Sequence, residues 1–332
     1  MGNSRGISVF VSTTPFAEHD RTPTQWMNAA GWRVCVNDTR RKLTSQEVAE
    51  RARDCEAIIA GTEDLNALLD ANRRLKIIAR VGVGLDSVPL ERCRERNIAV
   101  AYTPDAVTPA VAEFAVGAMI AACRDIPGAD RNMRGGGWRR TQGIRIGESR
   151  IGIVGFGRIG STVGRLLAGF APAALLVHDV LDKRADIAAL PAGAAARQAS
   201  LNEILETCDI VSLHVPLRQS TRGLIGAREL RRMRGGSYLI NTARGGIVDE
   251  DALYDALRSG HLGGAAVDVF GREPYTGPLR ELDRVVLTAH MGSCSIDCRS
   301  RMERDATAEI VRFFSGDALA YPVPDDEYAN QA

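Results

Sequence analysis

Short apolar, β-branched runs alternate with amphipathic stretches along most of this chain, and no other feature constrains the fold as strongly. A short run that is apolar throughout fits a strand buried on both faces, whereas apolar residues three and four positions apart fit a helix with one buried side. Strands that alternate with helices build parallel sheets whose faces are covered by helices. We therefore expect an α/β protein with doubly wound parallel sheets.

The alternation runs from an apolar strand near the N-terminus to a long helix near the C-terminus. The expected strands cover residues 7–11, 57–60, 75–79, 98–101, 151–154, 175–177, 210–213, 237–240, 264–267 and 285–288. The expected helices cover residues 44–55, 110–124, 159–170, 201–207, 249–259 and 297–314.

A length of 332 residues favours two domains, each large enough for a hydrophobic core of its own. One boundary is expected where a strand ends near residue 103, just before the long apolar segment 109–122. The other is expected near residue 295, ahead of the final helix. If that helix packs on the N-terminal sheet, residues 1–103 and 296–332 form one discontinuous domain, and residues 104–295 form a second domain inserted into it.

Charge and cysteine usage exclude several classes of function. Lys and Arg number 42 against 41 Asp and Glu, and a net charge of +1 argues against a general nucleic-acid binder. We see no apolar run that approaches the ~20 residues of a transmembrane helix, and no signal-peptide core. The seven scattered cysteines are typical of reduced thiols, and Cys294 and Cys298 lack further metal-ligand partners. We expect a cytoplasmic protein without a metal site.

A glycine-rich loop follows the expected strand 151–154 and precedes an expected helix. In such a Gly-x-Gly-x-x-Gly loop, the glycines permit a tight turn, close approach of a pyrophosphate, and close packing of helix on strand. A second strand ends in Asp179, 19 residues after the loop, where a carboxylate can bind ribose hydroxyls. Asp179 should repel a 2′-phosphate and favour NAD, although Lys183 and Arg184 leave NADP open. The loop positions expected to bind the cofactor are Gly155, Gly157, Arg158, Ile159 and Gly160.

Three further strands are followed by Arg244, Glu273 and His290. In a doubly wound sheet, ligands bind outside the carboxyl ends of the strands. An arginine can bind a carboxylate and polarise the neighbouring oxygen, and a histidine can exchange a proton with a hydroxyl group during hydride transfer. Each residue alone has a plain structural interpretation, as a salt-bridge former, a turn residue and a core histidine. Together they indicate chemistry on a 2-keto or 2-hydroxy acid.

These motifs, with 214–217, 241–250, 268–270 and 290–292, resemble the D-isomer-specific 2-hydroxyacid dehydrogenase family over nearly the whole chain. The resemblance implies a flavodoxin-like substrate domain with an inserted NAD-binding domain, and a homodimer formed through the NAD domain. It makes Arg244, Glu273 and His290 the substrate-binding and catalytic residues. It assigns Asp268 to the nicotinamide carboxamide and places Thr108 beside the cofactor. The remaining positions that it implies at the cofactor are His214, Val215, Pro216, Thr242, Ala243 and Gly292.

The segment from Arg80 to Val83 resembles the carboxylate-binding loop of the family, in its phosphoglycerate dehydrogenase-like form. Backbone N–H groups of Val81, Gly82 and Val83 can meet a substrate carboxylate, since glycine lets the chain approach closely. The hypothesis is that Arg80 binds a second anionic group of the substrate, such as the phosphate of 3-phosphoglycerate or a phosphonate. The alternative is that Arg80 pairs with a nearby carboxylate of the protein. Residues 316–332, after the last helix, are too few for a regulatory domain.

Two other functions remain open at this point. One is a glyoxylate/hydroxypyruvate-type reductase that acts on small keto acids without a second charge. The other belongs to a different class, an NADH-sensing corepressor-like protein. A sensor has no need of acid–base chemistry, so Arg244, Glu273 and His290 together favour an enzyme. The basic segment that contains Trp138, Arg139 and Arg140 resembles one that can reach a neighbouring subunit.

Overall fold

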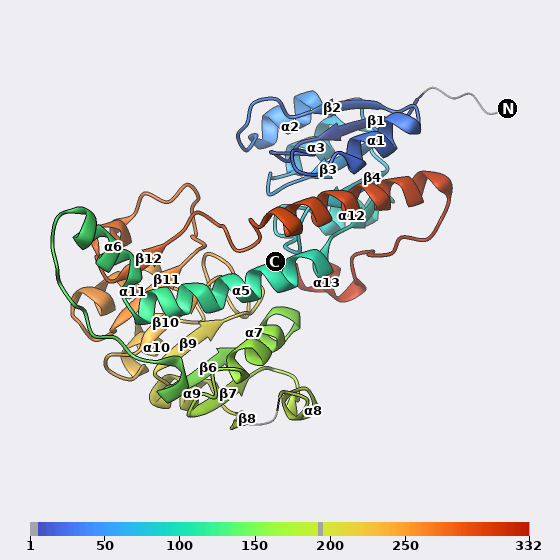
Figure 1. Cartoon of the computed structure of the whole chain (residues 1–332). Helices are drawn as coiled ribbons and strands as arrows, with labels where there is room; N and C mark the ends of the chain where they lie inside the picture. Colours follow the sequence, from blue (N-terminus) through green and yellow to red (C-terminus); the bar gives the residue numbers. More distant parts are fainter. Residues whose placement is uncertain (1–5, 192–194, 332) are drawn as a thin grey trace. The chain divides into compact units, whose positions relative to one another are not determined.

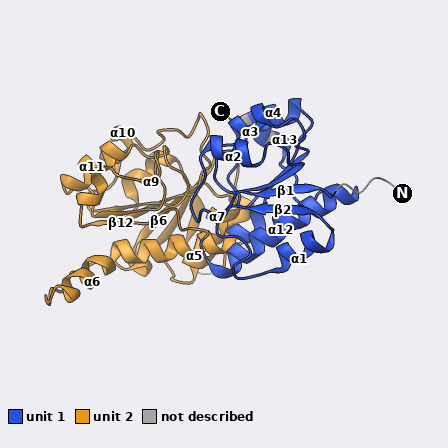
Figure 2. Cartoon of the chain, turned by 90° about the horizontal axis from the view of Figure 1, so that it is seen from above, with its two compact units in different colours: residues 1–107, 294–332 blue, residues 108–293 orange. Residues whose placement is uncertain are grey.

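The computed structural model describes residues 6–191 and 195–331 and divides into two compact units (Figure 1, Figure 2). Unit 1 consists of residues 1–107 and 294–332, and unit 2 consists of residues 108–293. The boundaries expected from the sequence, after residues 103 and 295, differ from these by a few residues. Each unit holds one parallel sheet with helices on both faces, so the expected doubly wound α/β class is confirmed.

Unit 1 contains a five-stranded sheet with the order β2-β1-β3-β4-β5, and every strand pair in it is parallel. Its interior strands are buried on both faces, which is why the sequence shows them as unbroken apolar runs. The strands are β1 (Ser8–Val11), β2 (Arg33–Val36), β3 (Ala57–Ala60), β4 (Ile77–Arg80) and β5 (Ala99–Ala101).

Helices cover both faces of the unit 1 sheet. One face forms a core with α2 (Ser45–Arg51), α3 (Asn66–Ala71) and α4 (Leu90–Glu95), and α2 begins at a capping box formed by Thr44 and Glu47. The other side is packed by α1 (Thr22–Ala29) and α12 (Ile296–Ser315), which contacts β3 and β4. The last helix is α13 (Asp325–Asn330). Helix α12, from the C-terminal part of the chain, therefore covers one face of a sheet whose strands all come from the N-terminal part.

Unit 2 contains a seven-stranded parallel sheet with the order β12-β11-β10-β9-β6-β7-β8. The chain starts in the middle of this sheet, builds outward to one edge, and then returns to build toward the other edge. The strands are β6 (Arg150–Val154), β7 (Ala174–His178), β8 (Ala196–Gln198), β9 (Ile210–Leu213), β10 (Tyr238–Asn241), β11 (Gly264–Val267) and β12 (Val285–Leu287).

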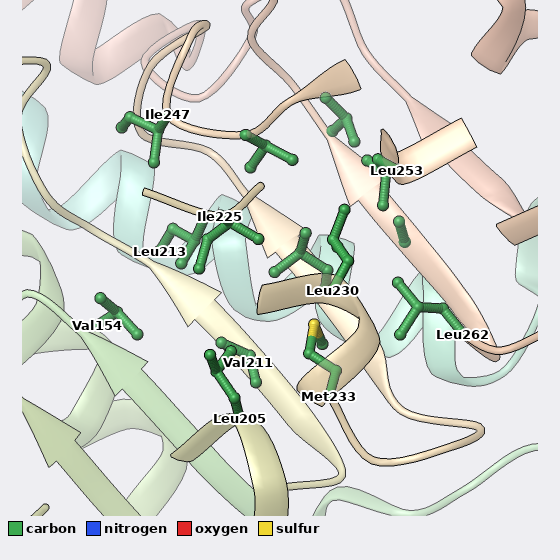
Figure 3. Close-up of a cluster of buried hydrophobic side chains, with 14 of the residues drawn as sticks. Val154, Leu205, Val211, Leu213, Ile225, Leu230, Met233, Ile247, Leu253 and Leu262 are labelled. Atoms are coloured by element: carbon green, nitrogen blue, oxygen red, sulfur yellow. The ribbon is translucent and has the colours of Figure 1, made fainter. Parts of the chain in front are cut away.

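Except in the edge strand β8, residues of each unit 2 strand enter two different cores. Val154 and Val211 pack with α9 (Leu201–Thr207), α10 (Ala227–Arg232) and α11 (Glu250–Arg258), as Figure 3 shows for part of this cluster. Their neighbours Ile153 and Ile210 pack on the opposite face with α5 (Pro104–Cys123), α7 (Arg158–Ala168) and α8 (Arg184–Ala188). The remaining helical segments of the unit are α6 (Ile126–Arg134), η1 (Ile146–Glu148) and η2 (Pro278–Glu281).

Helix α5 is longer and more apolar than the sequence pattern suggested. It has 20 residues and begins at Pro104, with Pro109 inside it, whereas the expected helix began at residue 110. It is long and apolar enough to span a membrane, so the expectation that no apolar segment approaches that length is wrong. Its side chains Ala112, Ala115 and Met119 are fully buried in the core of unit 2. Its apolar composition is therefore explained by its position as a core helix.

Candidate active site

The order of the unit 2 strands creates a topological switch point between β6 and β9, from which the sheet is built outward in both directions. Ligands of doubly wound sheets bind in the crevice outside the carboxyl ends of the strands at such a point. Gly155 follows β6 and His214 follows β9, so these two residues border the crevice. A Cβ atom added at Gly155 would lie 2.7 Å from the carbonyl oxygen of His214, which shows how closely the two strand ends approach.

The glycines of the loop meet three separate requirements. Gly155 has φ +91°, a conformation that favours glycine. A Cβ atom at Gly160 would lie 2.0 Å from the carbonyl oxygen of Gly155, so helix α7 packs directly on the loop. Gly157 is the N-cap of α7, and a Cβ atom there would meet no atom within 4 Å. The loop therefore combines a tight turn with open space at the N-terminus of a helix, where a pyrophosphate can bind. Arg158 and Ile159 form the first turn of α7.

Asp179 follows β7 and lies beside this loop. Its Oδ2 accepts a hydrogen bond of 2.7 Å from the Phe156 N–H group, and its Oδ1 accepts one of 2.9 Å from the Leu181 N–H group. The side chain is partly exposed, and a carboxylate oxygen can accept more than one hydrogen bond. Asp179 therefore fixes the glycine loop and still offers acceptor capacity for a ribose hydroxyl group.

The strand ends next to the loop supply further features that fit a dinucleotide. Thr242, directly after β10, is buried, and its Oγ1 atom has no hydrogen-bond partner among the described residues. Such buried polar atoms are rare unless a ligand or water satisfies them. His214 Nε2 lies 2.8 Å from Ser212 Oγ, and burial lowers the pKa of His214 to about 4. An open helix N-terminus, a carboxylate acceptor and an orphaned hydroxyl together fit a bound nicotinamide dinucleotide.

The other residues that the resemblance implies at the cofactor lie in the same unit. Val215 is partly buried and Pro216 exposed, directly after His214, and Ala243 is partly buried after Thr242. Thr108 lies in α5 and is the first residue of unit 2.

His290 and Glu273 form a hydrogen-bonded pair beyond the ends of β12 and β11. Nδ1 of His290 lies 3.0 Å from Oε2 and 3.2 Å from Oε1 of Glu273, and 39% and 35% of the two side chains are exposed. A carboxylate can only accept, so His290 Nδ1 carries the proton in this contact. The remaining ring nitrogen, Nε2, is then the one that can exchange a proton with a ligand. The N–H group of Phe270 donates to Glu273 Oε1 at 3.1 Å and helps to fix the carboxylate.

Asp268 is almost completely buried beneath the turn that carries His290. Its carboxylate accepts hydrogen bonds from Thr288 Oγ1 at 2.6 Å, from the Met291 N–H group at 2.7 Å and from the Gly292 N–H group at 2.9 Å. Its carbonyl oxygen accepts the N–H group of His290 at 2.8 Å. These bonds hold His290 at φ +54°, a conformation that non-glycine residues adopt infrequently. In the structure, Asp268 thus has a positioning role that the sequence did not predict.

Arg244 follows β10 and is partly exposed. Its Nη1 donates to the carbonyl oxygen of Ala243 at 2.6 Å, and its own carbonyl oxygen accepts from Asn241 Nδ2 at 3.1 Å. A Cβ atom at Gly245 would lie 2.0 Å from the carbonyl of Phe270, so the Arg244 turn packs against the segment that leads to Glu273. Arg244, Glu273 and His290 therefore all lie at the carboxyl edge of one sheet.

In unit 1, the guanidinium of Arg80 is buried and folded over the loop that follows it. Nε donates to the Gly84 carbonyl at 3.0 Å and Nη1 donates to the Val81 carbonyl. The N–H group of Val81 donates to Ala60 at 2.9 Å, and that of Gly82 donates to Thr103 Oγ1 at 2.7 Å.

Two of the three N–H groups expected to meet a carboxylate are therefore already engaged. In the described part of the chain, the loop N–H groups without an acceptor belong to Val83 and Gly84, which are both partly exposed. Sequence reasoning missed Gly84, because only the hydrogen bonds of the folded loop reveal which of its N–H groups remain available.

Comparison with known proteins agrees with this geometry. The family described as "D-isomer specific 2-hydroxyacid dehydrogenase, NAD binding domain" matches residues 116–292. A glyoxylate reductase of Korarchaeum cryptofilum is 36% identical over 81% of this chain and 83% of its own length. A D-3-phosphoglycerate dehydrogenase of Methanocaldococcus jannaschii is 33% identical over 83% of this chain but only 53% of its own length. The crystal structure of TT0316 protein from Thermus thermophilus superposes with a TM-score of 0.87 at 32% identity, covering 96% of this chain and 100% of that one.

The matched segment contains the dinucleotide loop, Asp179 and the Arg244–Glu273–His290 set. The relatives and the solved structure extend the similarity through both units. The chain therefore belongs to the D-isomer-specific 2-hydroxyacid dehydrogenase family and is an NAD(P)-dependent 2-hydroxyacid dehydrogenase.

Proposed function

We propose that this enzyme interconverts a small 2-keto acid and its D-2-hydroxy acid with NADH, as a reductase of the glyoxylate/hydroxypyruvate type. The observation that carries the proposal is the hydrogen-bonded His290–Glu273 pair on the same sheet edge as the dinucleotide loop. A proton donor beside a nicotinamide site is the arrangement that keto-acid reduction requires. The glyoxylate reductase relative supports this substrate class.

When bound, a reduced nicotinamide supplies a hydride to C2 of the keto acid. His290 delivers the accompanying proton from Nε2 to the carbonyl oxygen, while its Nδ1–H group remains bonded to Glu273 and the carboxylate stabilises the imidazolium form. Arg244 binds the substrate carboxylate and polarises the adjacent carbonyl through its permanently charged fork. In unit 1, the N–H groups of Val83 and Gly84 have no acceptor in the described part of the chain and can receive an anionic group. Hydroxy-acid oxidation follows the reverse proton path.

The surroundings of Arg80 favour this substrate class over one with a phosphate. Arg80 donates to two carbonyl groups of its own loop, so its charge already serves the loop conformation. A second anionic group, as in 3-phosphoglycerate, remains the competing candidate because phosphoglycerate dehydrogenases are among the relatives.

The expected cofactor is NADH rather than NADPH. The partly exposed carboxylate of Asp179 stands where an adenosine ribose would bind, and a 2′-phosphate would face a like charge there. Lys183 pairs with Asp186 at 3.2 Å, and Arg184 pairs with Asp182 at 2.6 Å, so nearby carboxylates already neutralise both cations.

We also propose a homodimer formed through unit 2. Helix α6 has no buried residue, and it presents Ile126 and Met133 at 50% and 52% exposure, followed by Trp138 at 81%. Exposed apolar side chains gathered in one segment are typical of a contact surface. Light scattering should give twice the mass of the 35.8 kDa chain, and Met133→Asp with Trp138→Asp should halve the measured value. A wild-type monomer at micromolar concentration would contradict this proposal.

The proposed activity is tested by following NADH oxidation with glyoxylate, pyruvate and hydroxypyruvate. His290→Gln should lower kcat by about a thousandfold, the range of general acid–base catalysis, while the Kd for NADH stays within about threefold. His261→Gln is the matched control, because His261 Nε2 contacts the Leu230 carbonyl away from the site. Replacing NADH with NADPH should lower kcat/KM at least about tenfold. Normal turnover in His290→Gln, or no oxidation of NADH with any keto acid, would refute the proposal.

A further inference from the structure

Glu273 lies on a loop of unit 2, residues 270–275, whose two ends are joined by aromatic rings. Phe270 and Tyr275 stack with their ring centroids 4.2 Å apart and their planes inclined by 18°. Because Glu273 lies between them in the sequence, we call this segment the Glu273 loop. No residue of the loop belongs to a helix or a strand, so contacts with neighbouring segments fix its position.

One of these contacts comes from Glu250, the first residue of α11. Its Oε1 accepts a hydrogen bond of 2.6 Å from the N–H group of Gly271, which is 21 positions away in the sequence. Hydrogen bonds to an ionised carboxylate are shorter and stronger than those between neutral groups. Glu250 therefore ties the start of the Glu273 loop to the segment that follows Arg244.

The start of the Glu273 loop also lies directly against the turn after β10. A Cβ atom added at Gly245 would lie 2.5 Å from the backbone nitrogen of Gly271. A Cβ atom added at Gly271 would lie 3.5 Å from Glu250 Oε1. The backbone at Gly271 is thus in close contact with both the backbone of Gly245 and the carboxylate of Glu250.

A short chain of hydrogen bonds leads from this point to the proton donor. Phe270 precedes Gly271, and its N–H group donates to Glu273 Oε1 at 3.1 Å. Glu273 Oε2 in turn lies 3.0 Å from Nδ1 of His290. A shift of the backbone at Gly271 therefore moves the donor that fixes Glu273, and with it the carboxylate that orients His290.

The N-terminus of α11 does not depend on Glu250. The N-cap residue is Asp249, whose Oδ1 accepts the N–H group of Ala252 at 3.1 Å. Asp251 supplies a second acidic side chain in the first turn, where negative charge stabilises a helix. The bond from Gly271 to Glu250 is therefore a contribution separate from the stability of the helix.

We propose that Glu250 is a positioning residue, which holds Glu273 against His290 so that the imidazole keeps the orientation that proton transfer needs. The inference rests on the proposed function and concerns the same site. Its requirement is an acceptor oxygen at the reach of a glutamate side chain, rather than a negative charge. Without that oxygen the start of the Glu273 loop can shift, and a displacement of about 1 Å at a catalytic group can lower the rate by up to about a hundredfold.

The test measures kcat, KM and the Kd for NADH with whichever of glyoxylate, pyruvate and hydroxypyruvate the wild type reduces fastest. Glu250→Gln keeps an acceptor oxygen at the same reach, so kcat should stay within about twofold. Glu250→Asp keeps the charge but is one methylene shorter, and Glu250→Ala removes the carboxylate. Each of these two should lower kcat about tenfold. KM and the Kd for NADH should stay within about threefold, because Asn241 holds the Arg244 turn independently.

A double-variant cycle separates positioning from a general loss of structure. In a Glu273→Ala background the side chain to be positioned is absent, so adding Glu250→Ala should lower kcat by less than about twofold. Asp251→Ala is the matched control, because it removes the neighbouring carboxylate of the same helical turn, and it should behave as the wild type. Since Glu250→Asp keeps the acidic first turn of α11, it tests the inference even if Glu250→Ala does not fold.

Three results would each overturn this inference alone. The first is normal kcat in Glu250→Asp. The second is a tenfold loss from Glu250→Ala that is as large in the Glu273→Ala background as in the wild type, which would indicate a general structural role. The third is a loss in Glu250→Gln or Asp251→Ala as large as in Glu250→Asp. Inactivity of the wild type on every keto acid contradicts the proposed function instead.

Discussion

The switch points of the two sheets are bordered by opposite kinds of residue. In unit 2, Gly155 and the carbonyl group of His214 meet between β6 and β9, and Gly157 leaves open space beside them. In unit 1, the side chains of Ser12 and Glu63 join across the gap between β1 and β3. Backbone groups border one crevice, whereas polar side chains bridge the other. Two sheets of one architectural class can thus be specialised by the size of the residues at a single pair of strand ends.

A second difference concerns the buried charge that shapes each ligand loop. Asp268 in unit 2 accepts from N–H groups and draws the His290 turn onto itself, while Arg80 in unit 1 donates to carbonyl groups. The sign of the charge decides which backbone groups are used internally. The Arg80 guanidinium donates to carbonyl groups of its loop, and N–H groups of the same loop can then bind an anion. The Asp268 carboxylate accepts hydrogen bonds from N–H groups of its loop, and the loop then presents the side chain of His290.

Among the variants that test this difference between the two loops, Asp268→Asn is expected to change activity most. An amide group presents its own N–H donors, so at least one donor among Thr288, Met291 and Gly292 loses its acceptor. We expect kcat to fall about a hundredfold, as a misplaced His290 would cause, with KM changed little. The free energy of unfolding in urea should fall by about 1–3 kcal/mol. Asp283→Asn, at an exposed site of the same unit, is the control. Unchanged kcat would show that Asp268 does not position His290.

The next largest effect concerns His214, at the unit 2 switch point, which should make the free energy of unfolding depend on pH. Its pKa is lowered by burial from 6.5 to about 4, so the unfolded chain binds this proton more readily. The stabilisation by neutral His214 is complete above pH 6.5 and is lost as the pH falls toward 4. Between pH 7 and pH 5 the loss should be about 2 kcal/mol, or roughly twentyfold in the unfolding constant. Urea titrations of wild type and His214→Asn measure it. Equal pH dependence in both proteins would argue against a neutral, enclosed imidazole.

The smallest of these effects is expected from Gly157→Ala, which tests whether the open space at α7 serves the cofactor. The added methyl group meets no protein atom within 4 Å, so the melting temperature should be nearly unchanged. A pyrophosphate at the helix N-terminus would meet the methyl group, so the Kd for NADH should rise about tenfold. Gly235→Ala, with equally open surroundings near the start of β10, should alter neither quantity. Unaltered NADH affinity in Gly157→Ala would weaken the contrast between the two crevices.

The sequence was most informative where structure depends on neighbouring residues. The strand before the glycine loop, Asp179 and the three strand-end residues were all found from local patterns, because parallel strands bring their carboxyl ends to one edge. Contacts between distant segments were not predictable. Ser12 and Glu63 are 51 positions apart, and the bond from Gly82 to Thr103 spans 21 positions. Helix α6, none of whose residues is buried, was also missed.

The discontinuity of unit 1 has a consequence for the newly made chain. Arg299 of α12 donates to Thr13, 286 positions earlier, and α12 packs on β3 and β4. Domains fold as units during synthesis, beginning from the N-terminus. Here the first sheet emerges from the ribosome early but lacks its covering helix until residues 296–315 follow. Unit 2, encoded without interruption, is complete before that. The nascent chain therefore contains all of unit 2 before α12 is available to pack on β3 and β4.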